Sequence, residues 1–425
     1  MRVKRNVRRL AWALGLLVVC AGLLQCRRGD GRPERIILIV VDTLRRDHVS
    51  PYGSAVATPN LQRLADRGQV FSKAVASFHQ TTMSMGALFS GRTPSLESGE
   101  TRRPLPWNGR HWCGLARFAA SAEDSCVPQG LITLAEDLER AGYWTVGVVS
   151  NRLLFRPAGY DQGFDEWIEV AADNPNQSAE VLARERSGLR VQAAVDEVLA
   201  SLPAQPLFLY VHYMDVHDHA LWGATYPEAV AKLDEQLGQL LERLESSGLL
   251  EDSVVLFTSD HGEILDEKFP VDGTRTHNGN PSFQPVLEIP LIVAPPHFED
   301  TDALIRSQDV ADLIRRVAGI EPAPAPEPAL ARDEQFTSER AYLTYRRGRF
   351  KSIFHRRRVR TWALFDLDAN PEEDVNLIAE EREVSLQHLA RVAELVKAFE
   401  VSARGPSQAS EEDRARLRAL GYLDD

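Results

Sequence analysis

RIILIVVDTLR (Arg35–Arg45) contains the stretch that decides the fold. Its first part, Arg35–Val41, is an unbroken run of aliphatic and β-branched residues, which is typical of a parallel strand buried on both faces of a sheet. Asp42 follows this run directly, and open α/β sheets bind ligands at the C-terminal ends of their strands. Asp42 is therefore a candidate site residue, and a turn or cap residue is the alternative.

Strand-length apolar runs alternate with helical patterns along most of the chain. Helices are predicted at Thr58–Gly68, Leu131–Ala141, Ser187–Leu202 and Tyr226–Leu249. Further strands are predicted at Trp144–Ser150, Pro206–Met214, Ser253–Ser259 and Glu288–Ala294. This alternation predicts an α/β fold over residues 34–320, with a doubly wound, mostly parallel sheet flanked by helices.

The C-terminal part of the chain has a different pattern. A Pro- and Ala-rich linker covers residues 321–331, and such composition favours a stiff surface segment. Short strands are predicted around 341–345, 350–355 and 361–366, and Glu383–Val401 is amphipathic. Residues 332–425 are therefore expected to form a small antiparallel-sheet subdomain with a helix.

The charge balance excludes one class of partner. The 425 residues carry a net charge of −12 and show no basic stripe interleaved with aromatic residues, so no nucleic-acid partner is expected. The composition gives no indication of an oligomeric state.

Residues 1–33 have the composition of an export segment. An uncharged apolar run, Leu10–Leu24, lies between basic residues on both sides, which is typical of a secretory signal or a short membrane anchor. A cleaved signal, an uncleaved anchor and a lipoprotein modified at Cys26 stay open, and all three predict an exported chain that meets the membrane through its N-terminus. In an oxidising compartment Cys113 and Cys126 are expected to form a disulfide; two separate buried thiols are the alternative.

The segment HQTTMSMGALFSGRTP (His79–Pro94) has the pattern of a short helix that begins at Thr81 and ends at Gly91. A hydroxyl at a helix N-terminus faces unpaired backbone N–H groups and the positive end of the helix dipole. This environment suits an anionic ester and an attacking alkoxide. Thr81 is therefore a candidate nucleophile, and a simple N-cap is the alternative.

Polar residues follow several of the predicted strands. They are Asp42, Asp215 and His217, Asp260 and His261, and, further along, His277 and Asn278. With the Thr81 hydroxyl, Asp42, Asp260 and His261 form a plausible oxygen and nitrogen shell for one divalent metal ion, whether Ca, Mg, Mn or Zn. Such an ion would lower the pKa of the Thr81 hydroxyl for attack on an anionic ester.

These segments resemble the sulfatase family of the alkaline-phosphatase-like superfamily. The matching stretches, in family order from about residue 36 to 423, are IILIVVDTLRRDH, TPNLQRLADRG, LFSGRTP, LAEDLERAGYWT, QGFD, FLYVHYMDVH, VVLFTSDHGE, LEIPLIV, LFDLDANPEEDVNL and RLRALGYL. The resemblance implies a metal-dependent hydrolase or transferase of sulfate or phosphate esters. It makes Asp42, Asp260 and His261 metal ligands and Thr81 the nucleophile.

The resemblance also implies which residues contact the substrate. His217 would contact the substrate or its leaving group, and Asp215, His277, Asn278 and Asn151 would belong to the substrate site. Asn151 stands where the family has its Lys-Trp-His stretch, in Ser150-Asn151-Arg152. The expected partner is an anionic ester of a small molecule, a glycan or a lipid headgroup.

The departures from the family pattern point to a threonine-nucleophile branch. Counted back from Gly91 and Arg92, the formylglycine motif falls on Thr81–Met85, which offers neither Cys nor Ser at the modified position. No formylglycine is therefore expected, and the usual release of a sulfated intermediate is lost. The second Asp of the family's opening pair is Thr43, and the motif's Arg is Met85.

Three functions stay open at this point. The first is a phosphoester hydrolase or transferase that uses Thr81, and the second is a sulfuric ester hydrolase with an altered nucleophile. The third is a degenerate, non-catalytic member that binds a glycan or lipid headgroup. Met85 in place of the family's Arg favours the third function, whereas Asp42, Asp260 and His261 favour the first two.

Overall fold

The computed structural model describes residues 31–93, 102–103, 111–112, 127, 131–170, 186–267, 269, 283–321, 330–338, 342–355 and 360–402. The four cysteines, the 1–30 segment, most of the predicted linker and His277 and Asn278 lie outside these residues. The predicted disulfide and export segment are therefore not tested. Within the described part, no helix is both long and apolar enough to cross a membrane.

The predicted α/β sheet is confirmed. Its seven strands have the order β2-β10-β9-β1-β8-β6-β7. The parallel strands are β1 (Arg35–Val41), β6 (Trp144–Val149), β7 (Glu166–Glu169), β8 (Leu207–Tyr213) and β9 (Ser253–Ser259). At one edge β10 (Leu291–Ala294) pairs antiparallel with β9, and β2 (Gln69–Val70) pairs antiparallel with β10.

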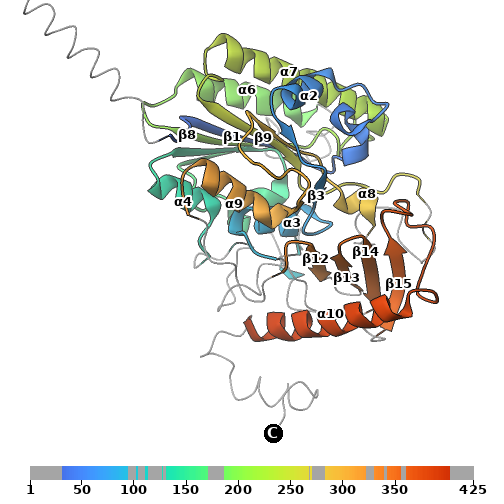
Figure 1. The fold of residues 1–425 in the computed structure, drawn as a ribbon. Helices are drawn as coiled ribbons and strands as arrows, with labels where there is room; N and C mark the ends of the chain where they lie inside the picture. Colours follow the sequence, from blue (N-terminus) through green and yellow to red (C-terminus); the bar gives the residue numbers. More distant parts are fainter. Residues whose placement is uncertain are drawn as a thin grey trace, which may run out of the picture.

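Helices cover both faces of this sheet (Figure 1). One face carries α2 (Pro59–Asp66), α6 (Ser187–Ala200) and α7 (Tyr226–Ser246), and the other carries α3 (Thr81–Ser90), α4 (Leu134–Arg140) and α9 (Ser307–Val317). Shorter elements connect them: η1 (Arg46–His48), η2 (Ser50–Tyr52), η4 (Arg152–Leu154), η5 (Arg156–Ala158), α8 (Gln284–Leu287) and the strand pairs β3 (Lys73–Val75) with β11 (Leu304–Arg306) and β4 (Arg102–Arg103) with β5 (His111–Trp112).

The strand β1 is buried on both faces because its alternate side chains belong to two separate apolar layers. Ile36, Leu38 and Val40 pack with α3, α4 and α9, whereas Ile37 and Ile39 pack with α2, α6 and α7. The strands β8, β1 and β9 are in register, since Val40 pairs with both His212 and Thr258. Even-numbered residues of all three strands therefore face α3.

The C-terminal subdomain is a four-stranded antiparallel sheet with α10 (Arg382–Ser402) against it (Figure 1). Its strands are β12 (Glu334–Ser338), β13 (Tyr342–Arg347), β14 (Phe350–His355) and β15 (Arg360–Asp366). The first strand was missed from the sequence because Glu334 and Gln335 break the apolar pattern. Both are buried, and the Glu334 carboxylate is held by Arg391 and by the Tyr345 hydroxyl.

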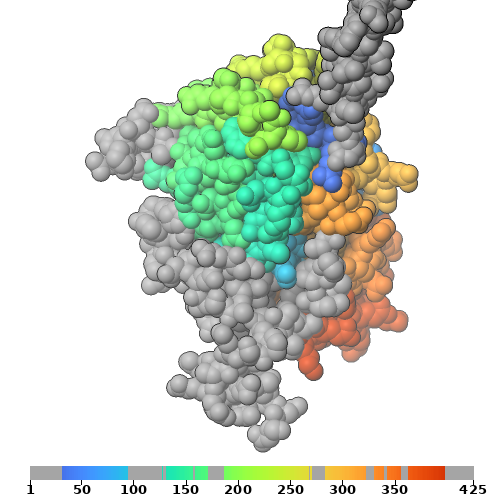
Figure 2. Space-filling view, turned by 90° about the vertical axis from the view of Figure 1, so that its left-hand side faces the viewer, coloured from blue at the N-terminus to red at the C-terminus, as the bar shows by residue number. Residues whose placement is uncertain are grey.

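Figure 2 shows one outer side of the molecule, on which helices of both layers and the C-terminal helix reach the surface. Residues of α4, in teal, lie below the green α6, and the orange α9 lies beside them with the red α10 beneath. The buried contacts between α9 and α3 make the helix that begins at Thr81 part of this rigid layer, because Ala311 and Ile314 share one apolar cluster with Met85, Leu88 and Phe89.

His388 on α10 makes the stability of this subdomain dependent on pH. Burial and the charge of Arg347 lower the pKa of His388 to about 4, and its Nδ1 lies 2.8 Å from the Ser352 hydroxyl. Because the folded state favours the neutral ring, its contribution is fully present above the unfolded pKa near 6.5 and is lost as the pH falls toward 4. We expect the free energy of unfolding to fall by roughly 1 kcal/mol per pH unit in that window.

His388→Asn is the matched variant, since its amide oxygen can still accept from Ser352. Urea unfolding of both proteins at several pH values should show the wild-type curve falling more steeply than that of the variant below pH ~6.5. Parallel curves would show that His388 is already accessible to protons in the folded state.

Candidate metal and ester site

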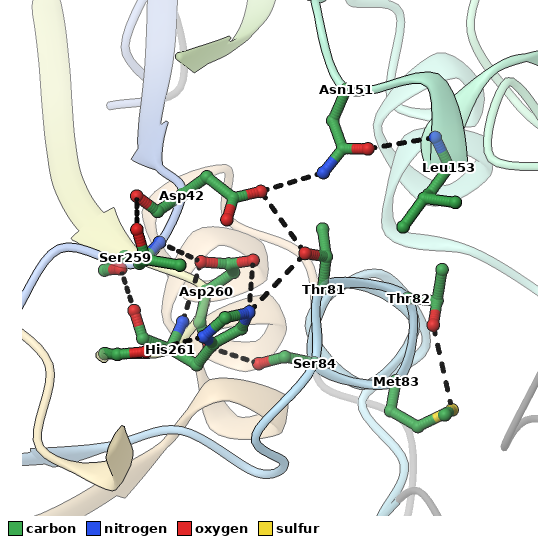
Figure 3. A network of polar contacts seen from close by, with 12 residues as sticks. Asp42, Thr81, Thr82, Met83, Ser84, Asn151, Leu153, Ser259, Asp260 and His261 are labelled. Carbon is green, nitrogen blue, oxygen red and sulfur yellow. Dashed lines mark hydrogen bonds and ion pairs between the residues drawn. The ribbon is translucent and has the colours of Figure 1, made fainter. Parts of the chain in front are cut away.

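Thr81 is the first residue of α3, and its hydroxyl faces the end of the sheet. The N-cap of the helix is Gln80, one residue earlier, so Thr81 is not the cap. Its Oγ1 lies 3.2 Å from Asp42 Oδ2 and 3.5 Å from His261 Nε2. The side chain of Thr82 points away from these groups toward the sulfur of Met83 (Figure 3).

Asp42, Asp260 and His261 converge beside Thr81. Each offers one ligand atom, and the three atoms lie within 4.8 Å of one another. All three side chains are buried. Register causes this convergence, because Val41 of β1 pairs with Ser259 of β9, so that Asp42 and Asp260 leave adjacent strands at the same level. These groups were expected at one edge of the sheet, and their side chains lie together there (Figure 3).

The donor set fits a divalent cation. Asp42 Oδ1 and Asp260 Oδ2 are buried and have no hydrogen-bond partner among the described residues. The other oxygen of each carboxylate does accept hydrogen bonds. Asp260 Oδ1 accepts from the backbone N–H groups of Thr43 at 3.1 Å and His261 at 2.8 Å, and Asp42 Oδ2 accepts from Asn151 at 2.8 Å. A buried carboxylate oxygen without a partner is costly unless a cation or a proton compensates it. Carboxylate, imidazole and hydroxyl donors suit Mg, Mn, Ca or Zn.

The pKa values of Asp42 and Asp260 are shifted in opposite directions. Burial and the negative charge of Asp42 raise the pKa of Asp260 to about 7. Burial also opposes the charged form of Asp42, but the hydrogen bond with His212 and the charges of His217 and His261 hold its pKa well below the usual range. Burial lowers the pKa of His261, which favours the neutral ring that a metal ligand needs.

Asn151 and Asp215 were both expected in the substrate site. The side chain of Asn151 contacts Asp42 at the cluster, and that of Asp215 contacts the start of α6. Asn151 Nδ2 donates to Asp42 Oδ2 at 2.8 Å, and its Oδ1 accepts from the backbone of Leu153. The carboxylate of Asp215 accepts from the backbone N–H of Gly188 at 2.7 Å and pairs with Arg186. Asn151 therefore orients Asp42, and Asp215 holds the start of α6.

His217 lies near the cluster on the loop after β8. Its side chain is 36% exposed, and Nδ1 lies 2.8 Å from Asp218. Desolvation opposes the charged ring, but the Asp218 hydrogen bond and the charges of Asp42, Asp218 and Glu263 raise the pKa of His217 to about 9. His217 is therefore an accessible imidazolium at neutral pH, whose charge interacts with that of Asp42.

His212 is a site residue that could not be recognised as such from the apolar strand pattern. This residue lies inside β8, where it was assigned to the apolar strand, yet its Nε2 lies 3.3 Å from Asp42 Oδ2. The signal that could have found it is strand alternation, since Phe208, Tyr210 and His212 share the face that points to α3.

Comparisons with known proteins agree with this fold. The Sulfatase family model matches residues 34–320. The chain is 27% identical to N-acetylgalactosamine-6-sulfatase of Canis lupus familiaris over 60% of its own length, and 27% identical to human arylsulfatase A over 58%. It spans about half of these relatives, 54% of each.

Two solved structures have the same fold at low identity. The first is a 2-O GAG sulfatase (TM-score 0.60, 14% identical, 86% of this chain and 92% of that one). The second is the phosphonate monoester hydrolase of Agrobacterium radiobacter (TM-score 0.57, 15% identical, 88% and 96%). Since the family match covers more than half of the chain, this protein belongs to the sulfatase family.

Replacing either carboxylate by an amide should weaken metal binding strongly. We expect Asp42→Asn and Asp260→Asn each to weaken Mn²⁺ binding by at least ~100-fold, because an amide replaces an anionic ligand. Asp234→Asn is the matched control: Asp234 is also buried, but it accepts from the backbone of Asn60 and Leu61 far along the chain from the cluster. Calorimetric titration with Mn²⁺ measures all four proteins, and a wild-type affinity in the Asp42→Asn variant would contradict the site.

Metal affinity should also fall on acidification. Because the pKa of Asp260 is raised to about 7 by burial and Asp42, the ion must displace a proton below that pH. The apparent Mn²⁺ affinity is expected to fall about tenfold per pH unit below pH ~7 and to level off above it. An affinity that is the same at pH ~6 and pH ~8 would show that Asp260 is ionised without metal.

Proposed function

We propose that this chain is a metal-dependent hydrolase or transferase of anionic esters in which Thr81 is the nucleophile and phosphate esters are preferred to sulfate esters. One observation carries the proposal: the Thr81 hydroxyl lies 3.2 Å from Asp42 Oδ2 and 3.5 Å from His261 Nε2, beside two buried carboxylate oxygens that have no hydrogen-bond partner among the described residues. A residue that only caps a helix does not require a carboxylate, an imidazole and unpaired carboxylate oxygens beside its hydroxyl.

Asp42, Asp260, His261 and Thr81 would hold the cation. Bound there, a divalent ion supplies the positive charge that lowers the pKa of the Thr81 hydroxyl and compensates the anionic ester. Asp42 Oδ2 accepts the hydrogen bond of that hydroxyl and fixes the direction of its lone pairs. The first turn of α3 adds backbone N–H groups and the positive end of its dipole.

The chemical step then follows from the residues present. Thr81 Oγ1, its proton released to solvent, attacks phosphorus; the bond between Oγ1 and phosphorus forms as the ester bond to the leaving alcohol breaks. His217 is protonated at neutral pH because its pKa is raised to about 9 by Asp218, Asp42 and Glu263 against the cost of burial. It can therefore give its proton to the leaving oxygen. Water or an acceptor alcohol then takes the phosphoryl group from Thr81.

The preference for phosphate rests on the nucleophile. An aldehyde-derived diol can expel sulfate by breaking its own C–O bond, whereas a threonine ester cannot. A threonine phosphate can be resolved by attack at phosphorus with inversion, the same in-line chemistry that formed it. The fold itself does not discriminate, because GAG sulfatase and phosphonate monoester hydrolase structures both share it.

Specific observations favour the two other functions. The curated relatives are named sulfatases, which favours a sulfuric ester hydrolase. Met85 replaces the Arg of the family motif and is fully buried in the apolar layer under α3, so it offers the substrate no charge. This loss favours a non-catalytic protein that binds a glycan or lipid headgroup, although such a protein has no need of a metal ion.

The same reasoning extends to the partner and the place of action. We infer an exported protein attached to or released from the membrane by residues 1–33, acting on an anionic ester of a small molecule, a glycan or a lipid headgroup. The basic and apolar composition of that segment supports this assignment.

Thr81→Ala should remove catalysis and leave the fold intact. With Mn²⁺ present, we expect turnover of an aryl phosphodiester to fall by at least ~10³-fold, because the Thr81 hydroxyl bonds the Asp42 carboxylate, whereas the nearby Ser84 hydroxyl donates to the backbone carbonyl of Asp260. The melting temperature should change little. The measurement is turnover over a panel of aryl phosphodiester, phosphate monoester and aryl sulfate, alongside thermal unfolding.

Thr82→Ala is the matched control, since it removes the same atoms one position along the same helix. Its side chain is buried but points toward Met83, so its turnover should stay within a few-fold of wild type. An active Thr81→Ala enzyme would return Thr81 to a purely structural role. Turnover of the aryl sulfate alone would replace the phosphoester preference with the sulfuric ester alternative.

A further inference from the structure

His212 has both ring nitrogens engaged in a fully buried position. The side chain of His212 is 0% exposed and faces α3 from the sheet. Its Nδ1 lies 2.6 Å from the Tyr210 hydroxyl, and its Nε2 lies 3.3 Å from Asp42 Oδ2. Burying an imidazole is unfavourable unless both nitrogens have partners. An apolar side chain would fill this position in β8 as well, so packing alone does not account for a histidine here.

The hydrogen bond from Tyr210 fixes the tautomer of the ring. Tyr210 is also fully buried, so its hydroxyl proton needs an acceptor, and His212 Nδ1 is its only hydrogen-bond partner among the described residues. The hydroxyl therefore donates to Nδ1. The ring proton is then on Nε2, which donates to Asp42.

The hydrogen bonds on Asp42 are all on one oxygen. Oδ2 accepts from Asn151 at 2.8 Å, from Thr81 at 3.2 Å and from His212 at 3.3 Å. Oδ1 has no hydrogen-bond partner in the described part of the chain. Three donors from three different elements thus hold the carboxylate in one orientation, in which Oδ1 makes none of these hydrogen bonds.

We propose that His212 is a positioning residue for the metal site: through the Tyr210–His212–Asp42 chain of hydrogen bonds it holds Asp42 so that Oδ1 is presented to the cation. This inference rests on the metal site proposed above and adds the reason for its orientation. His212 does not itself ligate in this arrangement, because its Nε2 carries the proton given to Asp42. Such outer hydrogen bonds orient the ligands of a metal and raise its affinity.

The test is Mn²⁺ affinity of the full chain by calorimetric titration, with the line shape of the bound ion by electron paramagnetic resonance. His212→Leu keeps most of the side-chain volume and removes the donor, so we expect binding weakened by roughly 10–100-fold and an altered line shape. His212→Gln can place an amide N–H near the position of Nε2–H, so it should recover most of the affinity.

Tyr210→Phe and Tyr213→Phe form a matched pair on the same strand. Tyr210→Phe removes the group that fixes the tautomer, and binding should weaken by roughly tenfold. Tyr213→Phe removes a buried hydroxyl on the opposite face of the sheet, where it contacts Gln192, so its Mn²⁺ affinity should equal that of the wild type. A general loss of stability would affect both variants alike.

The outcomes separate this inference from the proposed function. If the wild-type chain binds no Mn²⁺, both fall together. If wild type binds Mn²⁺ and His212→Leu binds it equally well, the metal site stands and the positioning role is wrong. If His212→Leu does not fold, the comparison of Tyr210→Phe with Tyr213→Phe and the recovery by His212→Gln decide, and equal affinities of the two Tyr variants would overturn the proposal.

Discussion

Two buried carboxylates held level on adjacent strands are the constraint on which the site depends. Asp42 and Asp260 each follow a strand of the same parallel pair, and the in-register pairing of Val41 with Ser259 places them side by side. Adjacent strands are only about 4.8 Å apart, so two negative charges there repel each other strongly in a buried setting. The pair is stable only with a shared proton or a cation, which links the site chemistry to strand register.

The chain leaves β1 through a strained turn that serves this pair. Thr43 has a positive φ of 59°, which is uncommon for a residue with a branched side chain. Its backbone N–H donates to Asp260 Oδ1, its carbonyl accepts from the Tyr226 hydroxyl at 2.6 Å, and that hydroxyl accepts from the backbone of Arg45 at 2.9 Å. Strain of this kind persists where surrounding contacts hold it, often at functional sites.

Much of the sheet could be predicted from the sequence because β1, β6, β8 and β9 are short apolar runs rich in β-branched residues, which favour buried strands. The antiparallel direction of β10 could not be predicted, because the sequence of a four-residue strand carries no signal for parallel or antiparallel pairing. In the small subdomain the three strands with apolar residues were predicted, whereas β12 was missed because its buried Glu334 depends on Arg391, a partner far along the chain. Propensity does not report such long-range compensation.

Strand alternation explains where four polar residues of this sheet edge lie. Asp42 and Asp260 are the first residues after their strands, so the alternation of side chains still fixes their direction toward α3. His212 obeys the same alternation from inside β8 and reaches Asp42 for that reason. Asp215 has the parity of Tyr213, which faces the opposite side of the sheet, and its carboxylate contacts the start of α6 on that side. Strand parity therefore brings Asp42, His212 and Asp260 together on the face of α3, whereas His261 reaches them from the turn that follows β9.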